Sequence, residues 1–138
     1  MIYVLDSSAI LRYLENETGA GRVAACITGH LALRDQIAIS AVQWGEVASV
    51  LLKLYGESEA LETLDELLAF NFNLVPATAE RAQRAAFLKA ELRLAYADAF
   101  AAELTLDSPE HTLITADFDF KVAAKKIKIE FLPAKSKP

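Results

Sequence analysis

Cysteine is nearly absent from this sequence, and the kinds of site that depend on it are absent as well. Cys26 is the single cysteine among 138 residues, which excludes an internal disulfide framework and a cysteine-rich zinc site. Histidine occurs only twice, and no serine, cysteine or histidine set has the pattern of a nucleophilic triad. A Gly-rich phosphate loop is also missing. Any chemistry in this chain therefore falls to its carboxylates.

Long apolar runs are missing too. No stretch approaches eighteen consecutive apolar residues, and the chain does not open with a basic, apolar and small-residue leader, although 54% of its residues are hydrophobic. We therefore expect a soluble protein that is not exported and resides in the cytoplasm. The length favours one domain, which we place at residues 1–133, followed by a short polar tail at 134–138.

Positive charge is scarce over the first part of the chain. Residues 1–80 carry 4 Lys or Arg against 11 Asp or Glu, whereas residues 81–138 carry 10 against 8. The net charge of −5 argues against indiscriminate binding of nucleic acid. Lysines crowd together between Lys121 and Lys128, but a solvated face explains such a run as well as a phosphate-binding track does.

Short apolar runs alternate with longer helical patterns along the whole chain. Most of the short runs are continuous, as expected for parallel strands that are covered on both faces. This alternation predicts an α/β domain of three layers, α/β/α, with a mostly parallel central sheet. The predicted strands are 2–5, 37–39, 73–75, 112–115 and 127–132, and the predicted helices are 8–15, 20–30, 41–56, 58–70, 77–93, 96–106 and 118–125.

Three residues predict the ends of the helix at 41–56. Ser40 and Gln43 have the spacing of a capping box, in which each side chain bonds the other residue's backbone N–H. Gly56 follows LLKLY and suits the C-terminal cap.

Acidic residues recur at strand ends and helix starts. Asp6 follows the first predicted strand, Asp117 follows the strand TLIT, and Asp98 opens the helix YADAFAAEL. Glu46 lies in the second turn of the helix that begins after Ser40. Because functional groups in an open parallel sheet collect at the carboxyl ends of its strands, we expect these acids to converge.

Each acid also has an ordinary structural interpretation. Asp6, Asp98 and Asp117 suit helix N-caps or first turns, and Glu46 suits the surface of an amphipathic helix. Asp98 and Glu46, however, stand among apolar residues with few basic partners nearby. Buried carboxylates must be paired, protonated or bound to metal. An all-oxygen site favours Mg²⁺, with Mn²⁺ as substitute, and predicts metal-dependent hydrolysis of phosphoesters.

Four motifs follow one another along the chain: IYVLDSSAI, ISAVQWGEV, LAYADAFAAEL and LITADFDF. Together they resemble the PIN domain, most closely the small VapC-type toxin nucleases of VapBC systems, and the resemblance extends from Met1 to IKIEFLP. Each motif is weak alone, whereas the ordered set is specific. The chain departs from the family pattern in two places. The stretch LAY stands shortly before Asp98, where a Ser or Thr is common, and Ala116 stands where a Gly is common.

The resemblance implies a role for each acid. Asp6 and Asp98 would bind Mg²⁺ directly, and Asp117 and Glu46 would complete the site directly or through water. Asp119 would be an auxiliary acid, and Ser8 and Thr115 would support the site as small hydroxyl residues. Residues that bind nucleic acid are not implied; Arg12, Tyr13, Trp44, Tyr96 and Phe118 are candidates only through their closeness in sequence to the acids.

The same resemblance implies a Rossmann-like sandwich that cleaves single-stranded regions of RNA as the toxin of a type II toxin–antitoxin system. It also implies a VapB-type antitoxin and a homodimer or a toxin–antitoxin hetero-oligomer. A catalytically silent PIN scaffold that binds protein or RNA stays open as an alternative. A signalling receiver fits poorly because no lysine directly follows TLIT, and a HAD-type phosphatase fails because Ser8 replaces its second Asp.

Overall fold

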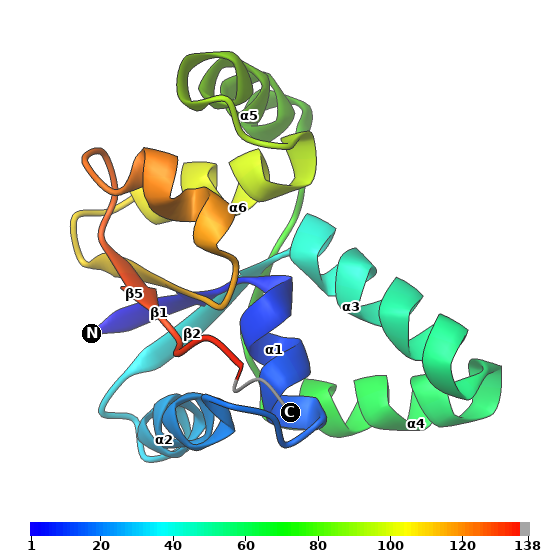
Figure 1. Cartoon of the computed structure of the whole chain (residues 1–138). Helices are drawn as coiled ribbons and strands as arrows, with labels where there is room; N and C mark the ends of the chain where they lie inside the picture. The colour runs from blue at the N-terminus through cyan, green and yellow to red at the C-terminus, as the bar shows by residue number, and fades with distance from the viewer. Residues whose placement is uncertain (136–138) are drawn as a thin grey trace.

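The structure, a computed structural model, describes residues 1–135; the last three residues of the predicted polar tail lie outside the described part. Strands and helices alternate along the chain as the pattern of short apolar runs predicts (Figure 1). In order, the elements are β1 (Ile2–Leu5), α1 (Ser7–Leu14), α2 (Ala20–Leu31), β2 (Gln36–Ser40), α3 (Ala41–Tyr55), α4 (Glu57–Leu68), β3 (Asn73–Val75), α5 (Ala79–Leu92), α6 (Tyr96–Leu106), β4 (His111–Thr115), the 3₁₀ helix η1 (Phe118–Ala123) and β5 (Ile129–Phe131).

The five strands form one sheet in the order β3-β2-β1-β4-β5, and every neighbouring pair is parallel. The chain builds outward from β1 to β2 and β3, and then returns to add β4 and β5 on the other side of β1. The strand order therefore reverses between β1 and β4. In open parallel sheets, this reversal opens a crevice at the carboxyl ends of the two strands.

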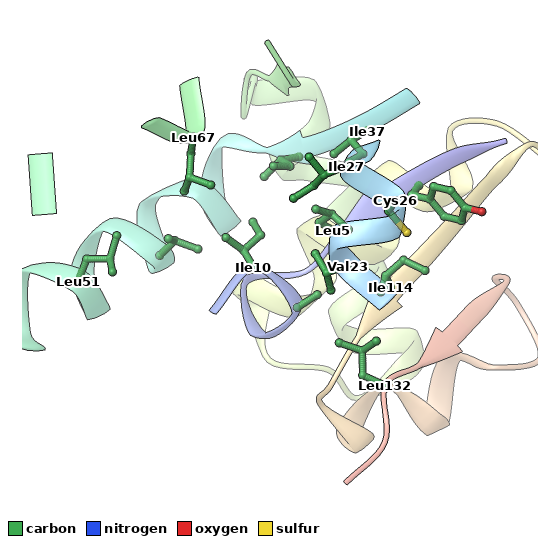
Figure 2. Close-up of a cluster of buried hydrophobic side chains, with 14 of the residues drawn as sticks. Leu5, Ile10, Val23, Cys26, Ile27, Ile37, Leu51, Leu67, Ile114 and Leu132 are labelled. Atoms are coloured by element: carbon green, nitrogen blue, oxygen red, sulfur yellow. The ribbon is translucent and has the colours of Figure 1, made fainter. Parts of the chain in front are cut away.

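Alternation along each strand divides the core into two layers. Tyr3 and Leu5 of β1 face a cluster that includes α1, α2, α3 and α4, whereas Val4 faces α5, α6 and η1 on the opposite side. Figure 2 shows the first cluster, in which Leu5 and Ile114 of the sheet meet Ile10 of α1 and Val23 of α2. The predicted three-layer α/β/α arrangement is confirmed.

Helices α3 and α4 form an arm that extends away from the sheet (Figure 1). Gly56 joins them with φ 83° and ψ 172°, a backbone conformation that residues with a Cβ rarely adopt. The predicted C-terminal cap of α3 is therefore confirmed, and the same glycine turns the chain directly into α4.

Two local predictions differ from the structure. Residues 118–123 form a 3₁₀ helix in place of the predicted ordinary helix; the segment has only two short turns and is capped by Asp117. The predicted capping box at α3 does not form: Ser40 Oγ accepts from the Val42 N–H instead of the Gln43 N–H, and the Gln43 side chain turns inward and bonds α6. Within residues 1–135, no helix is long and apolar enough to span a bilayer.

Candidate active site

The predicted acids meet at the carboxyl ends of β1 and β4. Asp6 directly follows β1, and its backbone N–H continues the ladder to Ile114 of β4 at 3.1 Å. Asp117 follows β4 and caps η1, while Asp98 lies in the first turn of α6. The charges of Asp6, Asp117, Glu46 and Asp119 all act on the Asp98 carboxyl. Helices α3 and α6, which carry Glu46 and Asp98, are in contact, so the acids form one cluster.

Asp6 is the most deeply buried member, with 2% of its surface exposed. Its Oδ2 atom accepts hydrogen bonds from Ser8 Oγ at 2.6 Å and Thr115 Oγ1 at 2.9 Å. Its Oδ1 atom is buried without a hydrogen-bond partner, and within residues 1–135 no cationic side chain pairs with it. Asp6 stands at the N-cap position of α1 but accepts no capping hydrogen bond, so the ordinary capping interpretation does not hold for it.

Burial and crowding raise the pKa of two of these carboxyls. Removal from water is the main cause for Asp6, opposed by the hydrogen bonds from Ser8 and Thr115 and reinforced by the charges of Glu46 and Asp117. Asp98 is half-buried, and its removal from water, together with the neighbouring acids, raises its pKa to about 7. Such a cluster binds protons or a cation near neutral pH because either one relieves the repulsion.

Two hydroxyl groups hold the Asp6 carboxylate in place, as predicted for small hydroxyl residues at these positions. Ser8 Oγ accepts from the Ala116 N–H at 2.9 Å, and Thr115 Oγ1 accepts from the Asp117 N–H at 3.0 Å. The hydroxyls lie 3.2 Å apart, but each has one proton, so neither has a proton left for the other when both donate to Asp6. This network ties the loop after β4 to the start of α1.

Asp117 has a structural role as well as its place in the cluster. Its Oδ1 atom accepts from the Asp119 N–H at 2.9 Å, which begins η1. The ordinary capping interpretation is therefore correct for Asp117. Asp119 is exposed and lies at the rim, as suits an auxiliary acid.

Two residues that sequence reasoning missed support the cluster. Ser7 Oγ donates to Glu46 Oε1 at 3.1 Å, which fixes a half-buried carboxylate of α3 against the start of α1. Gln43 is fully buried, and its Nε2 donates to the Ala97 carbonyl at 2.6 Å, one residue before Asp98. The position of Gln43, one turn before Glu46 on the same helix, is the signal that could have identified it.

Two of the candidate RNA contacts lie elsewhere. Arg12 is buried, and its Nη1 donates to the carbonyls of Thr18 and Pro133, so it fastens the C-terminal segment to α1. Trp44 is half-buried and packs against the core cluster that contains Tyr3 and Leu5.

The donor set fits a hard divalent cation. Within residues 1–135, no three His, Cys, Asp or Glu side chains are arranged to hold a metal ion by themselves. Mg²⁺ needs less, because it takes one or two direct carboxylates and keeps several waters. The unpartnered Asp6 Oδ1 and the half-buried Asp98 supply two carboxylates, and every oxygen around them suits Mg²⁺ or Mn²⁺.

Comparison with known proteins agrees with this architecture. Solved structures with a similar fold include a chain of VapBC2 from Rickettsia felis bound to a promoter DNA fragment (20% identity, TM-score 0.72, 96% of this chain and 100% of that one). They also include Mycobacterium tuberculosis VapC20, a toxin that cleaves the sarcin–ricin loop (18%, 0.69, 96% and 100%), and a chain of FitAcB from Neisseria gonorrhoeae (21%, 0.66, 94% and 96%). No curated protein matches this sequence.

The family assignment rests on the sequence itself. The model of the PIN domain matches residues 3–126, which include all four predicted acids and both supporting hydroxyl residues. The match spans β1 to the loop after η1, so it covers the whole crevice as well as most of the fold. The resemblance predicted from the four motifs is confirmed: this chain belongs to the PIN-domain family.

Proposed function

We propose that this protein is an endoribonuclease that uses Mg²⁺, or Mn²⁺ in its place, to hydrolyse phosphodiester bonds in single-stranded regions of RNA. The observation that carries the proposal is the Asp6 carboxylate. It is buried without a cationic partner, one of its oxygens is unpartnered, and other acids crowd around it. A carboxylate in that setting gains most from a bound cation.

Each acid has a part in this proposal. Asp6 and Asp98 hold the ion directly, and Asp117 and Glu46 hold it directly or through water. When bound, the ion polarises the phosphodiester and acidifies a water molecule. Ser8 and Thr115 keep Asp6 in one orientation.

Glu46 is the acid best placed to orient the attacking water. It comes from a different helix than the others, and Ser7 holds one of its oxygens, while within residues 1–135 no hydrogen bond engages the other oxygen. A fixed, half-buried carboxylate beside the metal ligands can accept a proton from water during hydrolysis.

The most direct test is cleavage of a mixed single-stranded RNA and of a tRNA pool at low, fixed salt, with Mg²⁺, Mn²⁺ or EDTA. We expect cleavage that requires the metal and is lost in Asp98→Asn. The exposed acid Asp65 of α4 provides the matched control, because Asp65→Asn removes a carboxylate far from the crevice. If folded protein binds RNA but cuts none under any condition, the chain is a silent PIN scaffold and the proposal is wrong.

We further propose that the protein is the toxin of a type II pair and that it binds a VapB-type antitoxin. Its assembly would be either a homodimer or a toxin–antitoxin hetero-oligomer. The folds of VapBC and FitAcB chains, similar over nearly their whole length, support this. The arm offers a surface for a protein partner: α4 is acidic, so it repels RNA, while Leu61 and Leu68 are exposed on it.

Substitution on the arm tests the association. Leu61→Asp with Leu68→Asp should abolish co-purification with a co-expressed VapB-type antitoxin while RNA cleavage is kept. Leu64 is a poorer choice, because it packs against the core and an aspartate there would destabilise the fold. Unchanged association of the double variant would exclude α4 as the contact surface.

A further inference from the structure

An aromatic stack lies at the rim of the acidic cluster. The rings of Phe118 and Phe131 are stacked with centroids 5.4 Å apart and planes 19° from parallel. The Lys121 ammonium lies over the Phe118 ring, 5.1 Å from its centroid. Phe118 is 38% exposed.

Local geometry builds this stack from two parts of the chain, η1 and β5. In a 3₁₀ helix, side chains at i and i+3 lie directly above one another, which places Lys121 over Phe118. Thr115 pairs with Phe131 in the β4–β5 register, so the Phe131 ring lies at the carboxyl end of the sheet, on the same edge as the acids. The exposed ring is thus backed by a second ring and held at the crevice.

Core packing accounts for only one of the two aromatics of η1. Phe120 is completely buried in the core cluster that contains Val4 and residues of α5 and α6, and it anchors η1. Phe118 follows Asp117 and precedes Asp119 in the chain, and the charges of both acids act on Asp98. Its exposed ring therefore belongs to the 3₁₀ helix that begins at the carboxylates we assign to hydrolysis.

We propose that Phe118, backed by Phe131, stacks on an unpaired base of the RNA substrate, and that Lys121 contacts a phosphate next to that base. This inference rests on the proposed ribonuclease function. Single-stranded nucleic acid is held by aromatic rings under its bases and by cations along its backbone. The ring and the cation are both present here, within one turn of the acids.

Charge supports the assignment of Lys121. The surrounding acids repel a phosphodiester, so a cation is required where the strand enters the crevice. Among residues 1–135, no salt bridge engages Lys121, whereas Lys126 pairs with Glu91 and Lys128 Nζ donates to the Pro109 carbonyl. The flexible lysine stem lets the ammonium leave the ring when a base takes its place.

A double-mutant cycle between protein and RNA isolates the stacking contact. Fluorescence anisotropy would measure the affinity of the Asp98→Asn protein, which does not cut, for a short labelled single-stranded RNA and for the same RNA with abasic positions. We expect Phe118→Ala to lower affinity for the intact RNA by roughly 5- to 140-fold, the range of base–aromatic stacking. On abasic RNA the same substitution should change little, because no base remains to stack.

Two further substitutions separate stacking from simple packing. Phe118→Leu keeps apolar contact with Phe131 but loses the aromatic face, so it should lower affinity for intact RNA as Phe118→Ala does. Phe118→Trp keeps an aromatic face, so its affinity for intact RNA should match that of the protein with Phe118. Lys121→Gln should reduce the slope of log affinity against log salt by about 0.7, the value for one phosphate contact on a single strand. Circular dichroism and thermal unfolding would verify that each variant is folded.

The outcomes distinguish this inference from the function on which it rests. If intact RNA is bound and the wild type cuts it, but folded Phe118→Ala binds intact RNA as tightly as its parent, the stacking inference is wrong and the ribonuclease stands. Equal losses on intact and abasic RNA would also overturn it. If the wild-type protein neither binds nor cuts the intact RNA with Mg²⁺ or Mn²⁺ present, both proposals fall.

Discussion

Asp98 combines a negative charge with surroundings that oppose it. Alanines occupy both neighbouring positions, and the nearest charges are those of four other acids. In Asp6 the same conflict is partly relieved by two hydroxyl donors, and in Asp117 by a backbone N–H donor. The three aspartates therefore have three different environments in one crevice. Because the half-buried Asp98 lacks such hydrogen-bond donors among residues 1–135, its carboxyl titrates near neutral pH.

The raised pKa of Asp98 predicts how stability depends on pH without metal. The unfolded carboxyl loses its proton near pH 3.8, whereas the folded one keeps it to about pH 7. The folded state thus binds more protons in that interval, so the free energy of unfolding should fall as pH rises through it. Urea unfolding in EDTA across this range should show the decline in the wild type.

Asp98→Asn should flatten that decline. The buried Asp6, whose pKa is also raised, would retain a contribution of the same sign. Asp65→Asn, on an exposed position of α4, is the control and should follow the wild type. An equally steep decline in Asp98→Asn would mean that Asp98 does not hold its proton in the folded protein.

Thr115 should control how tightly the site binds metal. Thr115→Val keeps the shape but removes the donor to Asp6 Oδ2 and the acceptor for the Asp117 N–H. Because loss of groups that orient ligands typically costs metal affinity 10- to 100-fold, we expect Mn²⁺ to bind about that much more weakly. Binding should also require higher pH, since the hydroxyl lowers the pKa of Asp6. Isothermal titration at several pH values would measure both effects.

Thr105 supplies the matched control for that experiment. It is a buried threonine at the other end of α6, and its hydroxyl donates to the Ala101 carbonyl within the helix. Thr105→Val should leave Mn²⁺ affinity unchanged. Equal affinities of the Thr115 and Thr105 variants would remove Thr115 from the support of the site.

At the scale of elements, α6 is the helix on which the crevice depends. Its alanines at 99, 101 and 102 are completely buried, so the helix lies close against β1, β2 and β4. One end is held by Gln43 of α3 and the other by ion pairs with α5. Movement of α6 would displace Asp98 from the other acids.

Glu103 joins α5 to α6. It is 4% exposed, and its carboxylate accepts from Arg81 Nη1 at 2.9 Å and from Arg84 Nε at 3.0 Å. Glu103→Ala should lower the free energy of unfolding by about 2 kcal/mol, since buried hydrogen bonds to charged groups are lost. Urea unfolding would measure it. Glu80→Ala, which removes only an exposed partner of Arg84, should change little, and equal effects of the two would contradict this role.

For the whole molecule, the reversal of strand order brings distant parts of the chain to one point. The hydroxyl of Ser8 and the backbone of Ala116 are 108 positions apart in sequence but bonded in the crevice. A cation bound there links α1, α6 and the loop after β4. Metal binding should therefore stabilise the fold as a unit and not only order a loop.

Thermal unfolding should record that coupling. At a Mg²⁺ or Mn²⁺ concentration of about 100 times Kd, a ligand that binds only the folded state stabilises it by about 2.7 kcal/mol. We expect Tm to rise with added metal in the wild type and to return to its starting value with EDTA. Asp6→Asn should abolish the metal-dependent rise, and an identical rise in that variant would place the cation elsewhere.

The sequence alone was sufficient for the order of elements and for the four acids. Continuous apolar runs such as IYVL predicted buried parallel strands, and Asp6 and Asp117 were identified because each lies just after such a run, Asp6 directly and Asp117 one residue further on. Gly56 was recognisable as a cap because it directly follows LLKLY and because glycine tolerates backbone conformations, such as the φ of 83° found here, that other residues rarely adopt. These features depend on near neighbours in the chain, so they can be read without the fold.

The partners of individual side chains were decided only by tertiary structure. Gln43 has the spacing of a capping residue, yet it bonds Ala97 of α6, and Arg12 holds Pro133 instead of facing the crevice. Ser7 meets Glu46, and Phe118 meets Phe131, across gaps in sequence that no local pattern describes. The physical reason is that a buried polar or aromatic group takes whichever partner the packed sheet brings within reach, and that choice follows from the strand order.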